Sequence, residues 1–142
     1  MSRPIYETAE TRLQEQSLIE YCCDKWNMDA IKLPIKYGVD YMAMDKRGKA
    51  TGFIELKQRT TTKDAYNTYF ISLHKMMNVQ ALIKATELPV TLVVQWTDWC
   101  GWVRLDTIPY HSIYAGGRGD RNDWQDREPM VHIPIKNFTL FK

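Results

Sequence analysis

Residues 39–57 read VDYMAMDKRGKATGFIELK, and this stretch decides the fold class. Two runs rich in β-forming residues, 39–44 and 51–57, flank the polar, glycine-containing segment 45–49. A short polar segment with a glycine between two such runs is typical of a β-hairpin. The stretch therefore predicts a pair of antiparallel strands.

The register of this hairpin brings two carboxylates together. With the turn centred on residues 47–48, Met44 pairs with Thr51 and Asp40 lies opposite Glu55. Directly opposed residues have Cβ atoms about 4.5–5.5 Å apart, and two like charges at that distance are destabilising. A divalent cation between the carboxylates would remove this conflict.

Apolar side chains cover both faces of the hairpin. Lys57 shares the face of Glu55, because side chains alternate along a strand. Met42, Met44 and Phe53 also lie on that face, and the opposite face carries Val39, Tyr41, Ala43, Ile54 and Leu56. Charges on a covered strand are costly unless they bind something, which weakens the alternative that Asp40, Glu55 and Lys57 are simply solvated.

The remaining elements predict an α/β fold in three layers, with a central mixed sheet flanked by helices. Their order is helix, three strands, helix and two strands. Apolar periodicity, turn residues and a Ser72 N-cap predict helices at 7–26 and 72–87, an edge strand at 30–35, a short strand at 69–71, and strands at 90–96 and 102–105.

The segment 106–142 differs from the preceding part of the chain in composition and patterning. Residues 115–128 lack periodicity and are rich in Gly, Asp and Arg, which predicts a long loop. Because its charges nearly cancel, we expect a specific contact at a dimer seam or over the site. Residues 130–135 predict a closing strand, with Phe138 and Phe141 packed behind it.

Composition restricts the class of protein. We expect a single domain over 1–142 with a core at about 7–105, because 142 residues suit one core. A net charge of +2 requires any anionic partner to be met by a local patch. The chain shows no secretion signal and no apolar run long enough for a membrane, and its three cysteines form no disulfide or zinc pattern. We expect a cytoplasmic protein.

The first helix offers another carboxylate. Glu15 shares a stripe with Ile19, Cys22 and Trp26 at spacings of four, three and four residues, which points it toward the core side. Glu20 falls on the solvated face. The alternative for Glu15 is a surface position at the apolar edge.

Asp40 followed by Glu55-Leu56-Lys57 resembles the D…(D/E)-x-K core of the PD-(D/E)XK nuclease superfamily. The chain departs from the pattern because Gly38-Val39, without the leading proline, precedes Asp40. The likeness is nearest to archaeal Holliday-junction resolvases and virus-type replication-repair nuclease domains, and covers about residues 15–105. The tail is similar to segments of small phage-encoded nucleases, which indicates a phage or prokaryotic origin.

The resemblance implies a metal-dependent deoxyribonuclease with a restriction-endonuclease-like fold. Asp40, Glu55, the Leu56 backbone carbonyl and Glu15 would hold one or two Mg²⁺ or Mn²⁺ ions through oxygen ligands. Lys57 would orient and help deprotonate the attacking water, or stabilise charge on the phosphate. The expected partner is DNA.

A basic and polar set near these carboxylates is the candidate DNA-binding surface. Helix N-termini favour phosphate, and exposed tryptophans stack on bases, for which Trp99 is the candidate. The set comprises Lys46, Arg47, Lys49, Arg59, Lys63, His74, Lys75 and Gln80.

The sequence leaves two sets of alternatives open. The first is a catalytically inactive module of the same fold that binds DNA or protein. The second concerns the substrate, because junction resolution, flap or single-strand cleavage, nicking and exonucleolytic trimming share these residues. A junction resolvase would need a symmetric homodimer to cut paired strands.

Overall fold

A computed structural model describes residues 9–107, 113–115 and 129–141, and confirms the predicted helices at both ends of the hairpin region. Within these residues, neither helix combines the length and apolar character needed to cross a membrane. The elements are α1 (Ala9–Trp26), β1 (Asp29–Lys32), η1 (Ile35–Tyr37), β2 (Tyr41–Met44), β3 (Ala50–Gln58), η2 (Lys63–Ala65), β4 (Thr68–Ser72), α2 (Leu73–Thr86), β5 (Val90–Gln95), β6 (Cys100–Arg104), β7 (Ile113–Ala115), β8 (Pro129–Pro134), η5 (Ile135–Asn137) and β9 (Thr139–Leu140).

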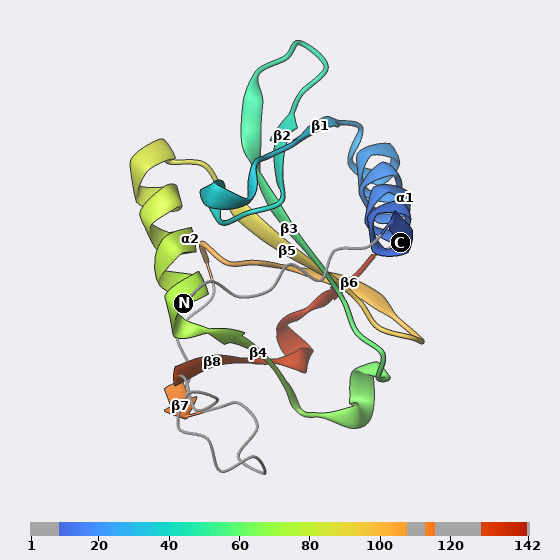
Figure 1. The fold of residues 1–142 in the computed structure, drawn as a ribbon, viewed down its shortest axis with the longest axis vertical. Coiled ribbons are helices and arrows are strands. Elements are labelled where there is room, and N and C mark those ends of the chain that lie inside the picture. Colours follow the sequence, from blue (N-terminus) through green and yellow to red (C-terminus); the bar gives the residue numbers. More distant parts are fainter. Residues whose placement is uncertain (1–8, 108–112, 116–128, 142) are drawn as a thin grey trace.

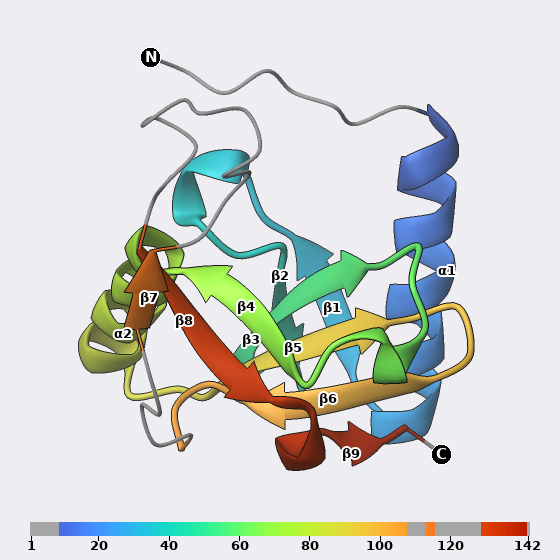
Figure 2. The ribbon, with the colours of Figure 1, turned by 90° about the horizontal axis from the view of Figure 1, so that it is seen from below.

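A six-stranded sheet in the order β1-β2-β3-β5-β6-β9 forms the centre of the molecule. Its strands pair antiparallel except for β3 and β5, which are parallel. Helices α1 and α2 lie on opposite faces of this sheet (Figures 1 and 2). The structure therefore confirms the three-layer α/β class with a central mixed sheet.

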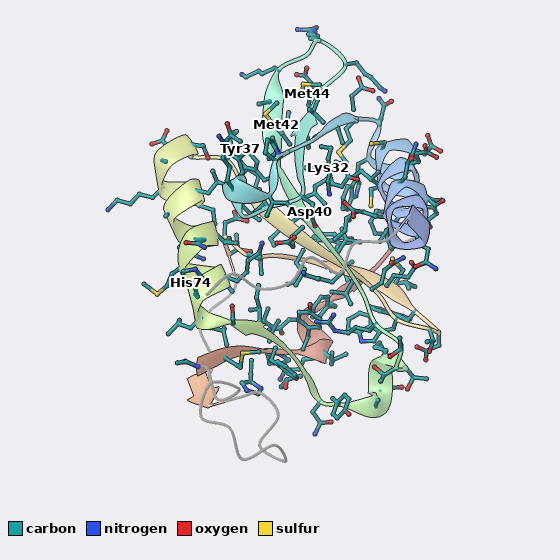
Figure 3. The ribbon with its side chains drawn as sticks, viewed as in Figure 1. Lys32, Tyr37, Asp40, Met42, Met44 and His74 are labelled. Atoms are coloured by element: carbon teal, nitrogen blue, oxygen red, sulfur yellow. The ribbon has the colours of Figure 1, made fainter. Side chains whose placement is uncertain are left out.

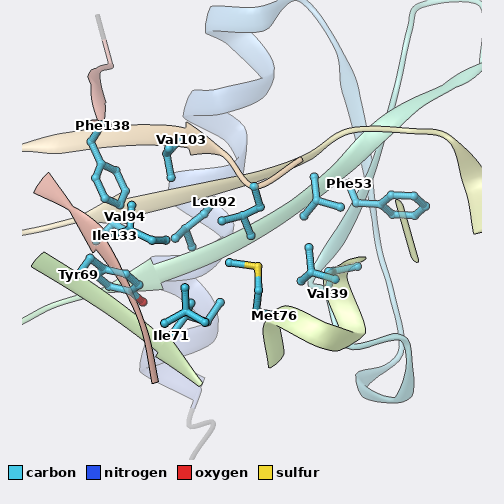
Figure 4. Close-up of a cluster of buried hydrophobic side chains, with 14 of the residues drawn as sticks. Val39, Phe53, Tyr69, Ile71, Met76, Leu92, Val94, Val103, Ile133 and Phe138 are labelled. Carbon is cyan, nitrogen blue, oxygen red and sulfur yellow. The ribbon is translucent and has the colours of Figure 1, made fainter. Parts of the chain in front are cut away.

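Two apolar clusters fill the layers on either side of the sheet. Alternation along β5 sends Leu92 and Val94 into the cluster beneath α2 (Figure 4), whereas Val93 packs in the cluster beneath α1. All three side chains are fully buried. The prediction that residues 90–96 form a strand covered on both faces is confirmed. Val39, by contrast, packs with Phe53 on the α2 side, because the chain bends before β2 begins.

The hairpin register is confirmed over most of its length and wrong next to the turn. Met42 faces Phe53 as predicted, but Met44 pairs with Ala50 because a bulge interrupts the ladder. The turn supplies the reason: Gly48 adopts a left-handed conformation with φ of 84° and donates its N–H to the Asp45 carbonyl. A turn followed by a left-handed glycine adds one residue to one strand.

A second sheet, in the order β4-β8-β7, lies on the α2 side of the molecule. The closing strand predicted at 130–135 is β8, and it pairs with β4 instead of the central sheet. Phe138 is buried beneath this sheet, and Phe141 is buried on the opposite face of the central sheet. The tail thus adds to the core expected at 7–105. The loop predicted at 115–128 lies outside the described residues after Ala115.

Removal of the Phe138 side chain tests whether the tail is part of the core. Phe138→Ala should lower the free energy of unfolding by about 3–5 kcal/mol, because a buried ring leaves a cavity. The neighbouring Leu140 is 44% exposed, so Leu140→Ala should cost less than about 1 kcal/mol. Urea denaturation measures both, and equal losses for the two variants would contradict the packing described.

Candidate active site

Asp40 stands at the entrance to β2 and is fixed from two sides. Its backbone carbonyl accepts a 2.8 Å hydrogen bond from the N–H of Leu33, and its Oδ2 accepts one of 2.8 Å from the N–H of Leu56. Gly38, in a left-handed conformation with φ of 77°, ends η1 and turns the chain into this position. The Asp40 carboxylate therefore sits beside β3 with 27% of its side chain exposed.

Glu55 lies next to Asp40 on β3 and is almost completely buried, at 1% exposure. Within the described residues it is the sole fully buried charged side chain. Its pKa is raised from 4.5 to about 8, first by burial and then by the hydrogen bond and charge of Asp40. The expected meeting of these two carboxylates is present, and it carries the predicted electrostatic conflict.

Lys75 reaches this pair from the first turn of α2. Its ammonium group forms an ion pair with Oε2 of Glu55 and donates a hydrogen bond to the carbonyl oxygen of Gly38. Ser72 fixes the helix start, because its Oγ accepts a 3.0 Å hydrogen bond from the Lys75 N–H. Lys75 was predicted to bind DNA, whereas the structure places its charge on the buried carboxylate.

Lys32 on β1 separates Glu15 from Asp40. Its ammonium is paired with Oε1 of Glu15 and lies 3.9 Å from Oδ1 of Asp40. It also lies 5.0 Å above the ring centroid of Tyr41. Figure 3 shows Lys32 beside Asp40. Glu15 is thus brought to the edge of the site, with a cation between it and Asp40. No sequence pattern pointed to Lys32.

Lys57 follows Glu55 by two residues on the same face of β3, and its side chain is exposed. No hydrogen bond or ion pair joins that side chain to another residue in the described part of the chain. Its charge contributes to lowering the pKa of Glu55, after the larger effect of Lys75. Lys57 is therefore a cation next to the carboxylates whose ammonium group is available to a substrate.

The donor set fits a hard divalent cation. Mg²⁺ commonly binds one or two carboxylates and fills its other positions with water and substrate phosphate. Asp40 and Glu55 supply the two carboxylates. The Leu56 carbonyl points toward the same edge as the Leu56 N–H that binds Asp40, because both groups of a strand residue share one side. Among the residues described, no three acidic, cysteine or histidine side chains form a ready metal cluster, so solvent or phosphate oxygens must complete the site.

The candidate DNA-binding residues at the hairpin tip lie away from the carboxylates. Lys46 pairs with Asp29 at 3.2 Å, and Arg47 and Lys49 occupy the exposed turn at one end of the molecule (Figure 1). Glu55 follows Lys49 by six positions along the chain, which corresponds to roughly 20 Å in a strand. The tip is thus not part of the carboxylate site.

Two members of the set lie beyond the end of β3. Arg59 donates a 2.6 Å hydrogen bond to Oη of Tyr69, and its guanidinium lies 4.6 Å over that ring. The ammonium of Lys63 lies 4.8 Å over the ring of Trp99 and 3.6 Å from Oδ1 of Asp64. Both cations therefore flank the loop that follows β3.

The other two lie on α2. His74 is exposed, with its Nε2 3.5 Å from Nδ2 of Asn78 (Figure 3). Gln80 is part-buried and donates a 3.2 Å hydrogen bond to the Leu105 carbonyl. The amide of Gln80 thus ties α2 to the end of β6 and is not directed at the carboxylates.

Known proteins resemble the chain in sequence and in fold. The chain matches, over residues 1–141, the family described as "Phage putative PDDEXK endonuclease". Among solved structures it is similar to Hjc of Archaeoglobus fulgidus, a Holliday junction resolvase from an archaeal hyperthermophile. The TM-score is 0.56 and the identity 11%, over 94% of this chain and 93% of the other. No curated protein sequence matches the chain. The structural likeness confirms the restriction-endonuclease-like fold.

The raised pKa of Glu55 predicts a pH-dependent stability in the metal-free protein. Between pH 4.5 and about 8 the folded state holds a proton that the unfolded state has lost, so stability falls as pH rises through this window. Thermal unfolding in EDTA should show the decline, and Glu55→Gln should flatten it. Glu20→Gln, at an exposed position of α1, is the matched control and should keep the decline. Equal slopes for wild type and Glu55→Gln would refute the raised pKa.

Proposed function

Because the chain belongs to the family of phage PD-(D/E)XK endonucleases, we propose that it is a Mg²⁺- or Mn²⁺-dependent deoxyribonuclease that hydrolyses phosphodiester bonds. The observation that carries the proposal is the Asp40–Glu55 pair, with the exposed Lys57 two residues further along the same strand face. These three groups are the ones that the resemblance assigns to metal binding and catalysis.

Asp40, Glu55 and the Leu56 carbonyl would hold the ion in this scheme. When bound, the ion supplies a Lewis acid for the phosphoryl oxygen and for the leaving 3′ oxygen. Asp40 would be held in place for this role, because its Oδ2 accepts a 2.8 Å hydrogen bond from the Leu56 N–H. Lys75 keeps Glu55 in place and favours its ionised form, since the nearby positive charge lowers the pKa of Glu55.

Lys57 takes the role nearest to the reacting atoms. Its ammonium can donate a hydrogen bond to the attacking water and hold it in line with the phosphate, or stabilise the extra negative charge that develops there. Lys75 does not fit this role, because its ammonium already contacts Glu55 and the Gly38 carbonyl. The two lysines of the site thus have different tasks.

Branched DNA is the substrate class to test first, since the fold is shared with an archaeal Holliday junction resolvase. Paired cuts on such a substrate would require a homodimer. Because the family is one of phage proteins, we propose that the protein acts in the cytoplasm of an infected cell. The alternative, an inactive DNA- or protein-binding module, has no use for the costly juxtaposition of Asp40 and buried Glu55.

Neutralising either carboxylate should separate cleavage from DNA binding. Asp40→Asn and Glu55→Gln should each lower cleavage by at least about 10²-fold, because a ligand of the ion is lost, while DNA affinity stays or rises as a negative charge facing phosphate disappears. Calorimetry with Mn²⁺ should show weakened binding in both variants. Glu20→Gln is the control, and unchanged Mn²⁺ affinity in Asp40→Asn and Glu55→Gln would remove the metal assignment.

Replacing each lysine by methionine keeps the stem and deletes the charge. Lys57→Met should reduce cleavage by about 10²-fold or more with little change in the thermal midpoint, because its ammonium holds no other described residue. Lys75→Met should lower the thermal midpoint, because Glu55 loses its partner in a buried site. Cleavage rates and melting curves measure these effects. If the activity of Lys57→Met stays within about threefold of wild type, a difference of ~0.65 kcal/mol, the proposed role of Lys57 in cleavage is refuted.

A further inference from the structure

A groove beyond the end of β3 contains a combination of side chains that the cleavage chemistry does not use. Two adjoining hollows, of about 340 and 750 Å³, form it and share Lys63, Tyr66, Thr68 and Ile135. We propose that this groove, called here the 59–70 groove, binds an unpaired DNA strand next to the cleavage site. The proposal rests on the proposed nuclease function and specifies the substrate further.

Exposed rings line the groove. Tyr66 is 66% exposed and Phe70 is 45% exposed, and both border the smaller hollow. Phe70 projects from β4, where its neighbours Tyr69 and Ile71 are buried, so alternation along the strand holds its ring outward. Rings presented to solvent on a fixed backbone are stacking platforms for bases, and each stacked base contributes about 1–3 kcal/mol.

Cations stand beside these rings. Arg59 borders the smaller hollow, Lys136 the larger one, and Lys63 both, while the described acidic lining is limited to Asp64. The guanidinium of Arg59 is oriented by its 2.6 Å hydrogen bond to Tyr69, so little further ordering is needed when it meets a phosphate. Residues 60–62 are three threonines, whose hydroxyl groups can donate to phosphate oxygens.

The groove continues the catalytic strand. Glu55, Lys57 and Arg59 occupy alternate positions, so they follow one face along the chain direction of β3 and its extension. At about 3.3 Å per residue, Arg59 lies roughly 7 Å beyond Lys57 and 13 Å beyond Glu55. Burial raises the pKa of Tyr69, the partner of Arg59, to about 12, and the negative charge of Glu55 adds to this rise. A strand whose phosphate lies at Asp40 and Glu55 therefore reaches the groove within a few nucleotides.

The chemistry favours an unpaired strand over other occupants. Hollows of this volume are the size of pockets that hold small ligands. Base faces are covered by their neighbours in a duplex, so Tyr66 and Phe70 gain stacking only from unstacked bases. An acidic peptide would use the cations and leave both rings without a partner.

Binding in EDTA tests the groove separately from cleavage. Fluorescence anisotropy would compare a short labelled oligothymidylate with a blunt duplex of equal length, using wild type and the double variant Tyr66→Ala/Phe70→Ala. The double variant should bind the oligothymidylate about tenfold or more weakly and the duplex within about twofold of wild type. The single variant Tyr66→Phe, which keeps a ring at position 66 and leaves Phe70 unchanged, should retain most of the wild-type affinity. Tyr37→Ala, at a 52% exposed tyrosine of η1 outside the groove, is the control.

Melting curves check that the double variant is folded. We expect it to fold, because both substituted side chains are exposed. Wild-type affinity for the oligothymidylate in the double variant, or an equal loss for the duplex, overturns the proposal. The proposal is also overturned if polyglutamate, at the same concentration of charges, displaces the oligothymidylate equally well from the wild type and from the double variant. Failure of wild type to cleave any DNA with Mg²⁺ or Mn²⁺ would instead refute the nuclease function, because the EDTA measurement does not depend on cleavage.

Discussion

A carboxylate buried in the central sheet is the constraint on which the rest of the site depends. Glu55 is 1% exposed and adjoins a second carboxylate, so its ionised form is costly without compensating charge. The fold brings that charge from α2, whose first turn positions Lys75 against Glu55. The same ammonium binds the Gly38 carbonyl and so ties α2 to the bend that leads into Asp40. One lysine therefore couples the two strands of the site to a helix.

The anchoring of Asp40 explains why β2 begins where it does. Its Oδ2 takes the N–H of Leu56, a group that a longer β2 would have bonded through its backbone. The side chain thus replaces a ladder hydrogen bond and stops the strand at Tyr41. The pairing with β2 therefore ends at Ile54, and Leu56 has no partner residue on β2 at the point where the two carboxylates meet. The Asp40 side chain therefore both ends the pairing of β2 with β3 and places a carboxylate beside Glu55.

The sequence was sufficient for the features that depend on short-range pattern. Alternation along 51–57 and a polar turn predicted the hairpin and the meeting of Asp40 with Glu55, and Ser72 predicted the start of α2. Contacts between segments far apart in the chain correspond to no short-range pattern in the sequence. Lys75 reaches Glu55 and Lys32 reaches Glu15 only after the sheet has assembled. The pairing of β4 with β8 likewise joins segments about sixty residues apart, and the bulge at Met44 depends on the conformation of Gly48.

Two lysines place positive charge beside the carboxylates. Lys32 approaches Asp40 from β1, and Lys75 approaches Glu55 from α2, so each carboxylate has positive charge on its outer side. The space between the carboxylates is left to a hydrogen bond that requires a proton, as the raised pKa of Glu55 indicates. A divalent ion held by both carboxylates would supply positive charge in place of that proton, so ion binding and protonation of Glu55 are expected to compete.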